Sequence, residues 1–192
     1  MNNIYGISHE KLVQAMLAKG QKSYRATQLF SWIYEKKAQS FDEMSDVSLS
    51  FREVLKGEYY FEVPKIYKTQ KSEDGTIKLL LELGDGHKIE TALLRYNYGN
   101  ALCVSSQVGC NMGCSFCASG LLKKRRNLEV DEMVGQILVM NALLNEEGKG
   151  EVVTHIVVMG TGEPFDNFEN VMDFIRIANH PKAFAIGARR IT

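Results

Sequence analysis

Three cysteines, Cys110, Cys114 and Cys117, fall within eight consecutive residues, and Cys103 lies seven residues upstream of the first. A β-strand sends alternate side chains to opposite faces, so a strand cannot gather these thiols. Gly113 lies between the first two, and glycine adopts backbone conformations that let a chain turn around a central ligand. Thiolates gathered in this way hold soft metals or iron–sulfur clusters.

The spacing C-x3-C-x2-C discriminates between the candidate metals. A structural zinc site usually takes two separated pairs of ligands, and no second pair or nearby histidine is present. Free cysteines that act as small apolar residues are common, but not at this density. Three thiolates on a four-iron cluster leave one iron open to bind and reduce a small molecule. We therefore predict a [4Fe–4S] cluster on Cys110, Cys114 and Cys117, with zinc as the alternative.

A second motif, Gly160-Thr161-Gly162-Glu163-Pro164, follows an apolar segment and precedes an amphipathic one. Ligands in open α/β structures bind outside the carboxyl ends of strands, where this motif is expected. Gly162 would let the backbone approach a bound molecule, and Glu163 offers oxygen atoms to a cationic amine. Glycine-rich turns that bind no ligand are about as common as those that do. The nearby cysteine motif favours binding.

Two further residues have ordinary interpretations when they are taken by themselves. Glu90 lies on an expected hairpin strand, where a glutamate is usually solvated. Cys103 fits a small apolar residue on a core strand equally well.

The segment from Ser105 to Ala118 is similar to the radical S-adenosylmethionine (SAM) superfamily and resembles its RlmN/Cfr family of RNA methyltransferases. The resemblance covers essentially all 192 residues. It implies an α/β fold with the first βα units of a partial (β/α)6 barrel, and [4Fe–4S] and SAM as cofactors. The implied reaction adds a methyl group to C2 of a specific adenosine in 23S rRNA and in tRNA. Cfr-type methylation at C8 of the same rRNA base is the alternative.

The resemblance also implies roles for single residues. Gly162 and Glu163 match the segment that contacts the amino group of SAM, and Glu90 matches the proton acceptor of a Glu-Thr motif. Cys103 matches a cysteine that resolves a covalent enzyme–RNA intermediate and can form a disulfide bond with a methyl-carrying cysteine near the C-terminus. The chain has no cysteine after Cys117. We therefore expect an N-terminal portion that is inactive by itself.

Composition narrows the class of partner. The 23 basic and 23 acidic residues give a net charge of zero, so RNA contact must rely on local patches such as residues 123–126. The N-terminus lacks the features of a secretory signal, and no apolar run approaches the ~20 residues that cross a bilayer. We expect a cytoplasmic monomer without a membrane partner. The family implies an electron donor such as a flavodoxin-type reductant.

Periodicity and turn residues predict three regions: a helical module at 1–62, a connecting β-meander at 63–98 and a radical SAM core at 99–192. Ser8 and Ser23 are predicted N-caps, and Ser40 to Glu43 matches a capping box. Asp-Gly pairs at 74–75 and 85–86 predict tight turns. Further helices are expected at 49–55, 130–145 and 167–178, and strands at 66–71, 76–83, 87–96, 102–107, 155–159 and 189–192.

Two other classes of function remain open at this point. A cluster-binding electron carrier would have the cysteines but would not bind SAM, and the Gly162-Glu163 turn argues against it. A zinc-binding RNA module would contain zinc in place of iron.

Overall fold

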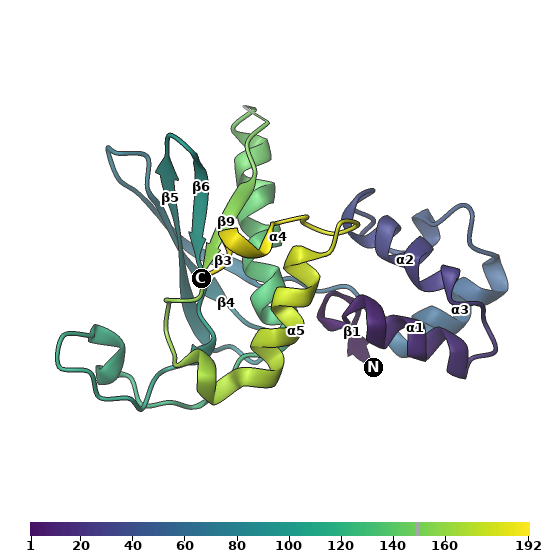
Figure 1. Ribbon diagram of the computed structural model, residues 1–192, viewed down its shortest axis with the longest axis horizontal. Coiled ribbons are helices and arrows are strands. Elements are labelled where there is room, and N and C mark those ends of the chain that lie inside the picture. Colours follow the sequence, from purple (N-terminus) through teal and green to yellow (C-terminus); the bar gives the residue numbers. More distant parts are fainter. Residues whose placement is uncertain (149) are drawn as a thin grey trace.

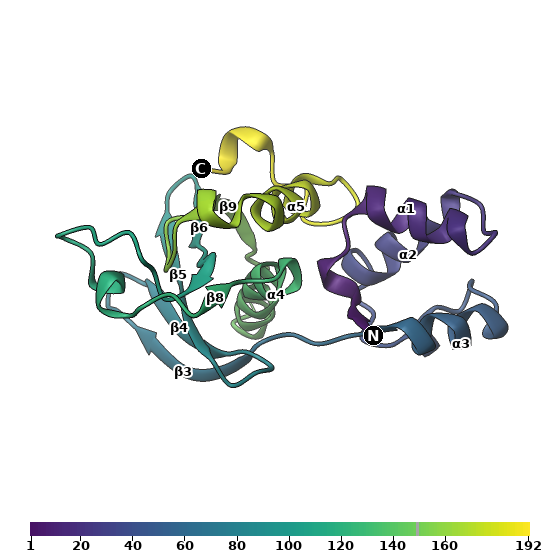
Figure 2. The same cartoon turned by 90° about the horizontal axis from the view of Figure 1, so that it is seen from below.

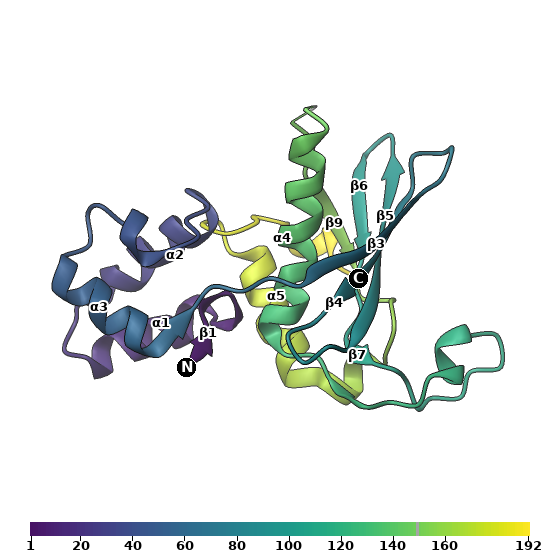
Figure 3. The ribbon, with the colours of Figure 1, turned by 180° about the vertical axis from the view of Figure 1, so that it is seen from behind.

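The N-terminal helical module and the sheet lie on opposite sides of two long helices (Figure 1). The structure is a computed structural model that describes residues 1–148 and 150–192. Because α4 and α5 pack on one face of the sheet and also face the module, they connect the two parts (Figure 3). Within the described residues, no helix is long and apolar enough to span a bilayer.

The module contains three α-helices and two 3₁₀ turns, which a short parallel strand pair holds together at its base. Ser8 caps the first helix as predicted, because its hydroxyl accepts a hydrogen bond from the Lys11 N–H. Its elements are β1 (Asn2–Asn3), η1 (Ile4–Gly6), α1 (His9–Ala18), α2 (Tyr24–Tyr34), η2 (Phe41–Glu43), α3 (Leu49–Glu58) and β2 (Tyr59–Tyr60).

Two capping predictions are wrong. Ser23 precedes α2, but its own backbone is helical, so within the described residues its hydroxyl caps no amide. The segment from Ser40 to Glu43 forms a single 3₁₀ turn and not the start of an α-helix. The Ser40 hydroxyl and the Gln39 N–H both donate to the Glu43 carboxylate there. Glu43 therefore stabilises the loop and does not cap an α-helix.

A five-stranded mixed sheet has the order β3-β4-β5-β6-β9. The first four strands form an antiparallel meander, and β9 lies parallel to β6 after a crossover through α4. Both Asp-Gly turns form as predicted, with Gly75 and Gly86 at φ +82° and +83°. The strands are β3 (Lys65–Lys71), β4 (Ile77–Glu82), β5 (Lys88–Tyr96), β6 (Gly99–Cys103) and β9 (Val153–Val157).

One face of the sheet packs on α4 (Val130–Glu146) and α5 (Phe168–Asn179). Alternate strand residues such as Leu79, Leu93 and Leu102 are fully buried there, as period-two patterning requires. The other face stays open. The predicted domain boundary at 98/99 remains a prediction, although β5 and β6 pair across it in the same sheet.

Between β6 and α4 the chain extends into an arm, residues 109–125, that projects away from the body (Figure 2). At its base, β7 (Gln107–Val108) pairs with β8 (Arg126–Asn127), and the arm carries the short turn η3 (Ala118–Leu121). The 3₁₀ turn η4 (Pro164–Asn167) leads into α5, and η5 (Ala188–Arg190) follows it. The strand predicted at 189–192 is wrong in extent, since only Ile191 bridges to β9.

The module packs against α5 and the segment that follows it. Lys11 forms an ion pair with Asp173, and the rings of His9 and His180 stack with their centroids 4.6 Å apart. Lys182 pairs with Glu35 at 3.1 Å. These contacts hold the module on the side of the body opposite to the arm (Figure 1).

Candidate functional site

Glu90 and Cys103 share the open face of the sheet. Ala92 pairs with Cys103 across β5 and β6, and Glu90 is two residues from Ala92 on the same strand, so the three side chains point to the same side. The Glu90 carboxylate lies 3.1 Å from the Lys78 ammonium on the neighbouring strand. Partial burial raises the pKa of the Cys103 thiol, although a backbone hydrogen bond from Met159 lowers it. A reactive thiol therefore needs a partner that takes its proton.

Ser105 connects the strand of Glu90 to the glycine-rich turn. Its hydroxyl donates to the Glu90 carbonyl at 2.6 Å and accepts from the Thr161 N–H at 2.9 Å. Its backbone N–H and C=O both bond to the amide of Gln136 on α4, at 2.9 and 3.0 Å. Ser105 and Gln136 are fully buried, and their polar groups are hydrogen-bonded. The network therefore fixes the strand of Glu90 and the glycine-rich turn relative to each other.

Gln107 connects the glycine-rich turn to the base of the arm. Its side-chain oxygen accepts from the Glu163 N–H at 2.9 Å, and its side-chain nitrogen donates to Asn127 at 2.8 Å. The Glu163 carboxylate in turn accepts from the Phe165 N–H at 3.0 Å and so caps η4. This bond occupies one carboxylate oxygen, Oε1. The other is left to accept from a ligand amine.

Gly162 lies against this network and has no room for a side chain. Its φ is +120°, and a Cβ placed there would lie 2.7 Å from Ser106 Oγ and from Gln107 Cβ. Gly160 is equally close to Ser105, with 2.7 Å to its N and Oγ atoms. The glycines of the motif are therefore required by close approach to the 105–107 segment.

The arm separates the three clustered cysteines. Cys110 is buried at its base, whereas Cys114 and Cys117 are exposed farther out. Hydrogen bonds from Ser119 lower the pKa of the Cys117 thiol, which favours the thiolate that binds metal. All four cysteines are free thiols, and the methyl-carrying cysteine that the resemblance pairs with Cys103 is not among them.

The donor set fits an iron–sulfur cluster in its chemistry. Three thiols occupy one arm, and the glycines at 109 and 113 have φ of +75° and +65°, which lets the arm turn sharply. Among the residues described, no three His, Cys, Asp or Glu side chains lie together in the way that a metal site requires. The conformation in the structure thus has the right ligands but not their convergence.

Comparisons with known proteins found relatives that match almost the whole chain. The family described as "Ribosomal RNA large subunit methyltransferase N-terminal domain" matches residues 2–60. The probable dual-specificity RNA methyltransferase RlmN of Enterococcus faecalis is 50% identical over 190 residues, which is 99% of this chain and 53% of that protein. Its namesake in Streptococcus equi subsp. zooepidemicus is 48% identical over the same length, with the same coverage. The chain belongs to the RlmN family.

A solved structure supports the same family. The crystal structure of a radical SAM methyltransferase from Sphaerobacter thermophilus superimposes with a TM-score of 0.85 at 37% identity, and the match covers 100% of this chain and 56% of that one. The mixed α/β architecture is therefore that of a partial radical-SAM fold, as the sequence predicted. The chain spans about half the length of the curated relatives that it matches.

The basic tract of this RlmN-family chain divides into two parts. The Arg126 guanidinium binds Asp85 and Glu132, each at 2.7 Å, and so has a structural role. Lys123 and Arg125 are exposed. Two further cations, Lys22 and Arg25, belong to the helical module, which lies on the side of the body opposite to the arm (Figure 1).

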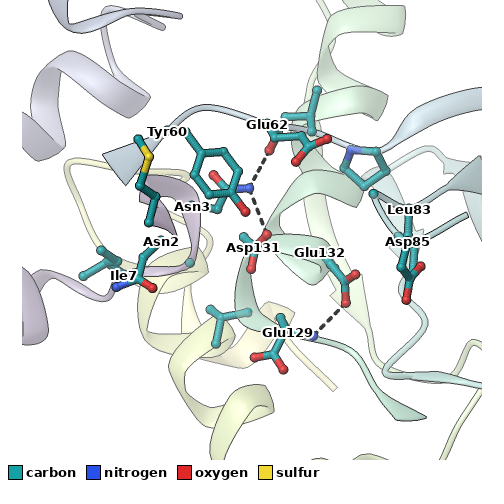
Figure 4. A pocket seen from close by; sticks show the side chains of 16 residues that line it. Asn2, Asn3, Ile7, Tyr60, Glu62, Leu83, Asp85, Glu129, Asp131 and Glu132 are labelled. Atoms are coloured by element: carbon teal, nitrogen blue, oxygen red, sulfur yellow. Dashed lines mark hydrogen bonds between the residues drawn. The ribbon is translucent and has the colours of Figure 1, made fainter. Parts of the chain in front are cut away.

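Two cavities lie away from the predicted site residues of the RlmN-family chain. One, of about 660 Å³, lies between the N-terminus, the β4–β5 turn and the start of α4 (Figure 4). Asn3 donates to Asp131 at 2.8 Å there, and burial raises the pKa of that carboxyl. The other, of about 840 Å³, separates the module from α4. None of the seven predicted site residues lines either cavity.

Sequence reasoning missed the residues that support the site. Ser105, Gln107 and Gln136 are fully buried, although they are polar, and their hydrogen bonds hold the turn and the arm base together. A signal was available, because a Ser-Ser-Gln run directly after an apolar strand is unusual for a core segment.

Proposed function

We propose that this chain holds a [4Fe–4S] cluster and SAM for the methylation of adenosine C2 in 23S rRNA and in tRNA. The observation that carries the proposal is the Gln107 amide, which bonds both the Glu163 turn and the base of the cysteine arm. It keeps the thiol-bearing arm and the amine-binding carboxylate at the same edge of the structure. A radical reaction is needed because adenine C2 is electrophilic and offers SAM no nucleophile.

The bound groups would be held as follows. Cys110, Cys114 and Cys117 would ligate the cluster once the arm curls so that the two exposed thiols meet the buried one. Glu163 would accept a hydrogen bond from the SAM amino group, and Gly162 would let the backbone approach it. When bound, the cluster and SAM supply the electron and the radical precursor.

The open face of the sheet would carry the proton chemistry. Glu90, whose carboxylate lies 3.1 Å from the Lys78 ammonium, would take the proton from adenine C2 after the new carbon–carbon bond has formed. Cys103, on the same face, would then attack the sulfur of the methyl-carrying cysteine that the family implies and this chain lacks. A disulfide bond would form, the bond between that sulfur and the new carbon would break, and the carbon would take up a proton to become the methyl group. A flavodoxin-type protein would supply the electron, and we expect the reaction to take place in the cytoplasm with a monomeric enzyme.

Metal and cofactor analysis of the anaerobically purified chain tests the proposal. We expect iron and sulfide in a ratio that fits one four-iron cluster, together with binding of labelled SAM. Replacing any one of Cys110, Cys114 and Cys117 by Ala should remove the iron, whereas Cys103→Ala should retain it. Glu163→Ala should weaken SAM binding without loss of iron.

Three results would contradict the proposal. Zinc without iron would indicate a zinc-binding module. A complete cluster without SAM binding would indicate an electron carrier. Equal loss of iron from Cys103→Ala would show that the ligands are assigned wrongly. For the reaction itself, chromatography of the methylated nucleoside beside 2-methyladenosine and 8-methyladenosine standards separates C2 from C8 products, which have the same mass.

A further inference from the structure

Two phenylalanines directly after the glycine-rich turn are exposed instead of packed in the core. The Phe165 side chain is 81% exposed and Phe168 is 49% exposed. Their rings are nearly parallel, with an interplanar angle of 9° and centroids 6.4 Å apart. Apolar surface exposed to water is unfavourable, so a pair of exposed rings at this place indicates a contact surface.

The position of these rings is fixed relative to the proposed SAM site. The Phe165 N–H donates to the Glu163 carboxylate at 3.0 Å, and Pro164 begins the same 3₁₀ turn. Asn167, between the rings in sequence, is buried and bonds two backbone carbonyls at 2.9 and 2.8 Å. The rings therefore stand on a rigid turn beside the carboxylate and not on a loose loop.

Positive charge lies next to the rings. Lys124 reaches Asp166, which is between the two phenylalanines, at 3.6 Å, and Asn127 donates to the Asp166 carbonyl at 2.9 Å. Lys124 and Asn127 thus hold this segment against η4. Lys123 and Arg125 are exposed on either side of Lys124, and in the part of the chain that the structure describes neither forms an ion pair.

A second pair of exposed rings in the same chain lacks this charge. Tyr96 and Tyr98 stack with their centroids 4.8 Å apart and are 46% and 63% exposed. The neighbouring Arg95 is neutralised by ion pairs with Glu147 and Glu151. Exposed rings with unpaired cations occur beside the site, whereas this pair lies beside compensated charge.

We propose that Phe165 and Phe168, together with Lys123 and Arg125, hold an unpaired nucleotide of the RNA substrate next to the Glu163 turn. This inference rests on the proposed function and assigns its RNA contact to a surface. Single-stranded nucleic acids bind where bases stack on aromatic faces and cations contact phosphates. Stacking does not depend on base identity, so this surface would position the strand while the site selects the adenosine.

Fluorescence anisotropy with a fluorescein-labelled single-stranded RNA of about ten nucleotides tests the surface. Phe165→Ala/Phe168→Ala should weaken binding about 5- to 150-fold at fixed salt, the range expected for one stacked base. Lys123→Ala/Arg125→Ala should reduce the slope of log K against log[salt] by about 1.4, because single strands lose about 0.7 per phosphate contact. Tyr96→Ala/Tyr98→Ala is the matched control and should bind like the unmodified chain.

Several outcomes would overturn the inference. They are the absence of RNA binding by the unmodified chain, an unchanged affinity of the phenylalanine variant, and an equal loss in the tyrosine control. Equal binding of a double-stranded RNA of the same sequence would indicate a general electrostatic contact. Iron content and SAM binding of the phenylalanine variant are measured in parallel and should not change. Absence of iron or of SAM binding in the unmodified chain would instead count against the proposed function.

Discussion

Replacing Gly162 by Ala should destabilise the chain for two separate reasons. The φ of +120° is a conformation that residues with a Cβ rarely adopt, and holding one there costs about 1–3 kcal/mol. The new Cβ would also lie 2.7 Å from Ser106 Oγ and from Gln107 Cβ. Overpacking of this kind costs about 1–3 kcal/mol more. The free energy of unfolding should therefore fall by about 2–6 kcal/mol.

Two control glycines separate strain from crowding. Gly86 has φ of +83°, and within the described residues nothing lies within 4 Å of its would-be Cβ, so Gly86→Ala adds strain alone. Gly57 lies in α3 and is equally open, with an ordinary φ. Gly57→Ala should stabilise the helix by about 0.5–1 kcal/mol. The expected order of stability is Gly57→Ala, unmodified chain, Gly86→Ala, Gly162→Ala.

Thermal unfolding followed by circular dichroism provides the measurement. A domain of this size loses about 2–4 °C in Tm per kcal/mol, so Gly162→Ala should lower Tm by about 4–24 °C. SAM binding should fall as well, because the Glu163 carboxylate is the next residue along the turn. If Gly162→Ala melts no lower than Gly86→Ala, crowding against the 105–107 segment does not exist and the reasoning is refuted.

Three further predictions concern single polar side chains. In an enzyme that also has the methyl-carrying cysteine, which this chain lacks, Glu90→Gln should leave iron content and SAM binding unchanged but slow methyl transfer to RNA by about 10²–10⁴. A normal rate of methyl transfer would show that Glu90 is an ordinary solvated residue of its hairpin. Partial burial raises the pKa of Asp85, but hydrogen bonds from the His87 N–H and from Arg126 lower it to about 2. The ionised Asp85 carboxylate therefore stabilises the folded state above the unfolded pKa of about 3.9, and this contribution is lost as the pH falls toward 2. Asp85→Asn should lower Tm at pH 7 and not at pH 2. A deficit of the same size at both pH values would exclude the charge as its cause. Asn167→Ala should cost about 1–3 kcal/mol in urea unfolding, because two backbone carbonyls lose their donor, and a cost below 0.5 kcal/mol would mean that water replaces it.

Local sequence determined the elements of this protein well. The Asp-Gly turns at 74–75 and 85–86 form because Asp accepts from the amide two residues on and Gly takes a positive φ, and both requirements are satisfied within four residues. The apolar stripe of α4 predicted its extent to within a residue at each end. The cysteine spacing likewise predicts a ligand set from one short segment. Such features depend on neighbours in sequence, so sequence alone carries them.

Local sequence was less reliable where a segment had alternative partners. Ser23 and Ser40 have the residue types of N-caps, yet each hydroxyl has a different local environment in the fold. The strand predicted at 189–192 is a 3₁₀ turn followed by a single β-bridge at Ile191. The length of a strand depends on how many residues of its neighbour, here β9, it can pair with, and the segment's own sequence does not set that number.

Tertiary structure alone decided how the site is assembled. Glu90 and Cys103 share a face because Ala92 happens to pair with Cys103, and a shift of one residue in that register would place them on opposite faces. Gln107 meets the Glu163 amide 56 residues away, and Ser105 meets the Thr161 amide at the same separation. Buried polar groups must find partners, but sequence does not say which of many distant amides is closest. Long-range strand pairing makes that choice, and it places Glu90, the glycine-rich turn and the base of the cysteine arm together.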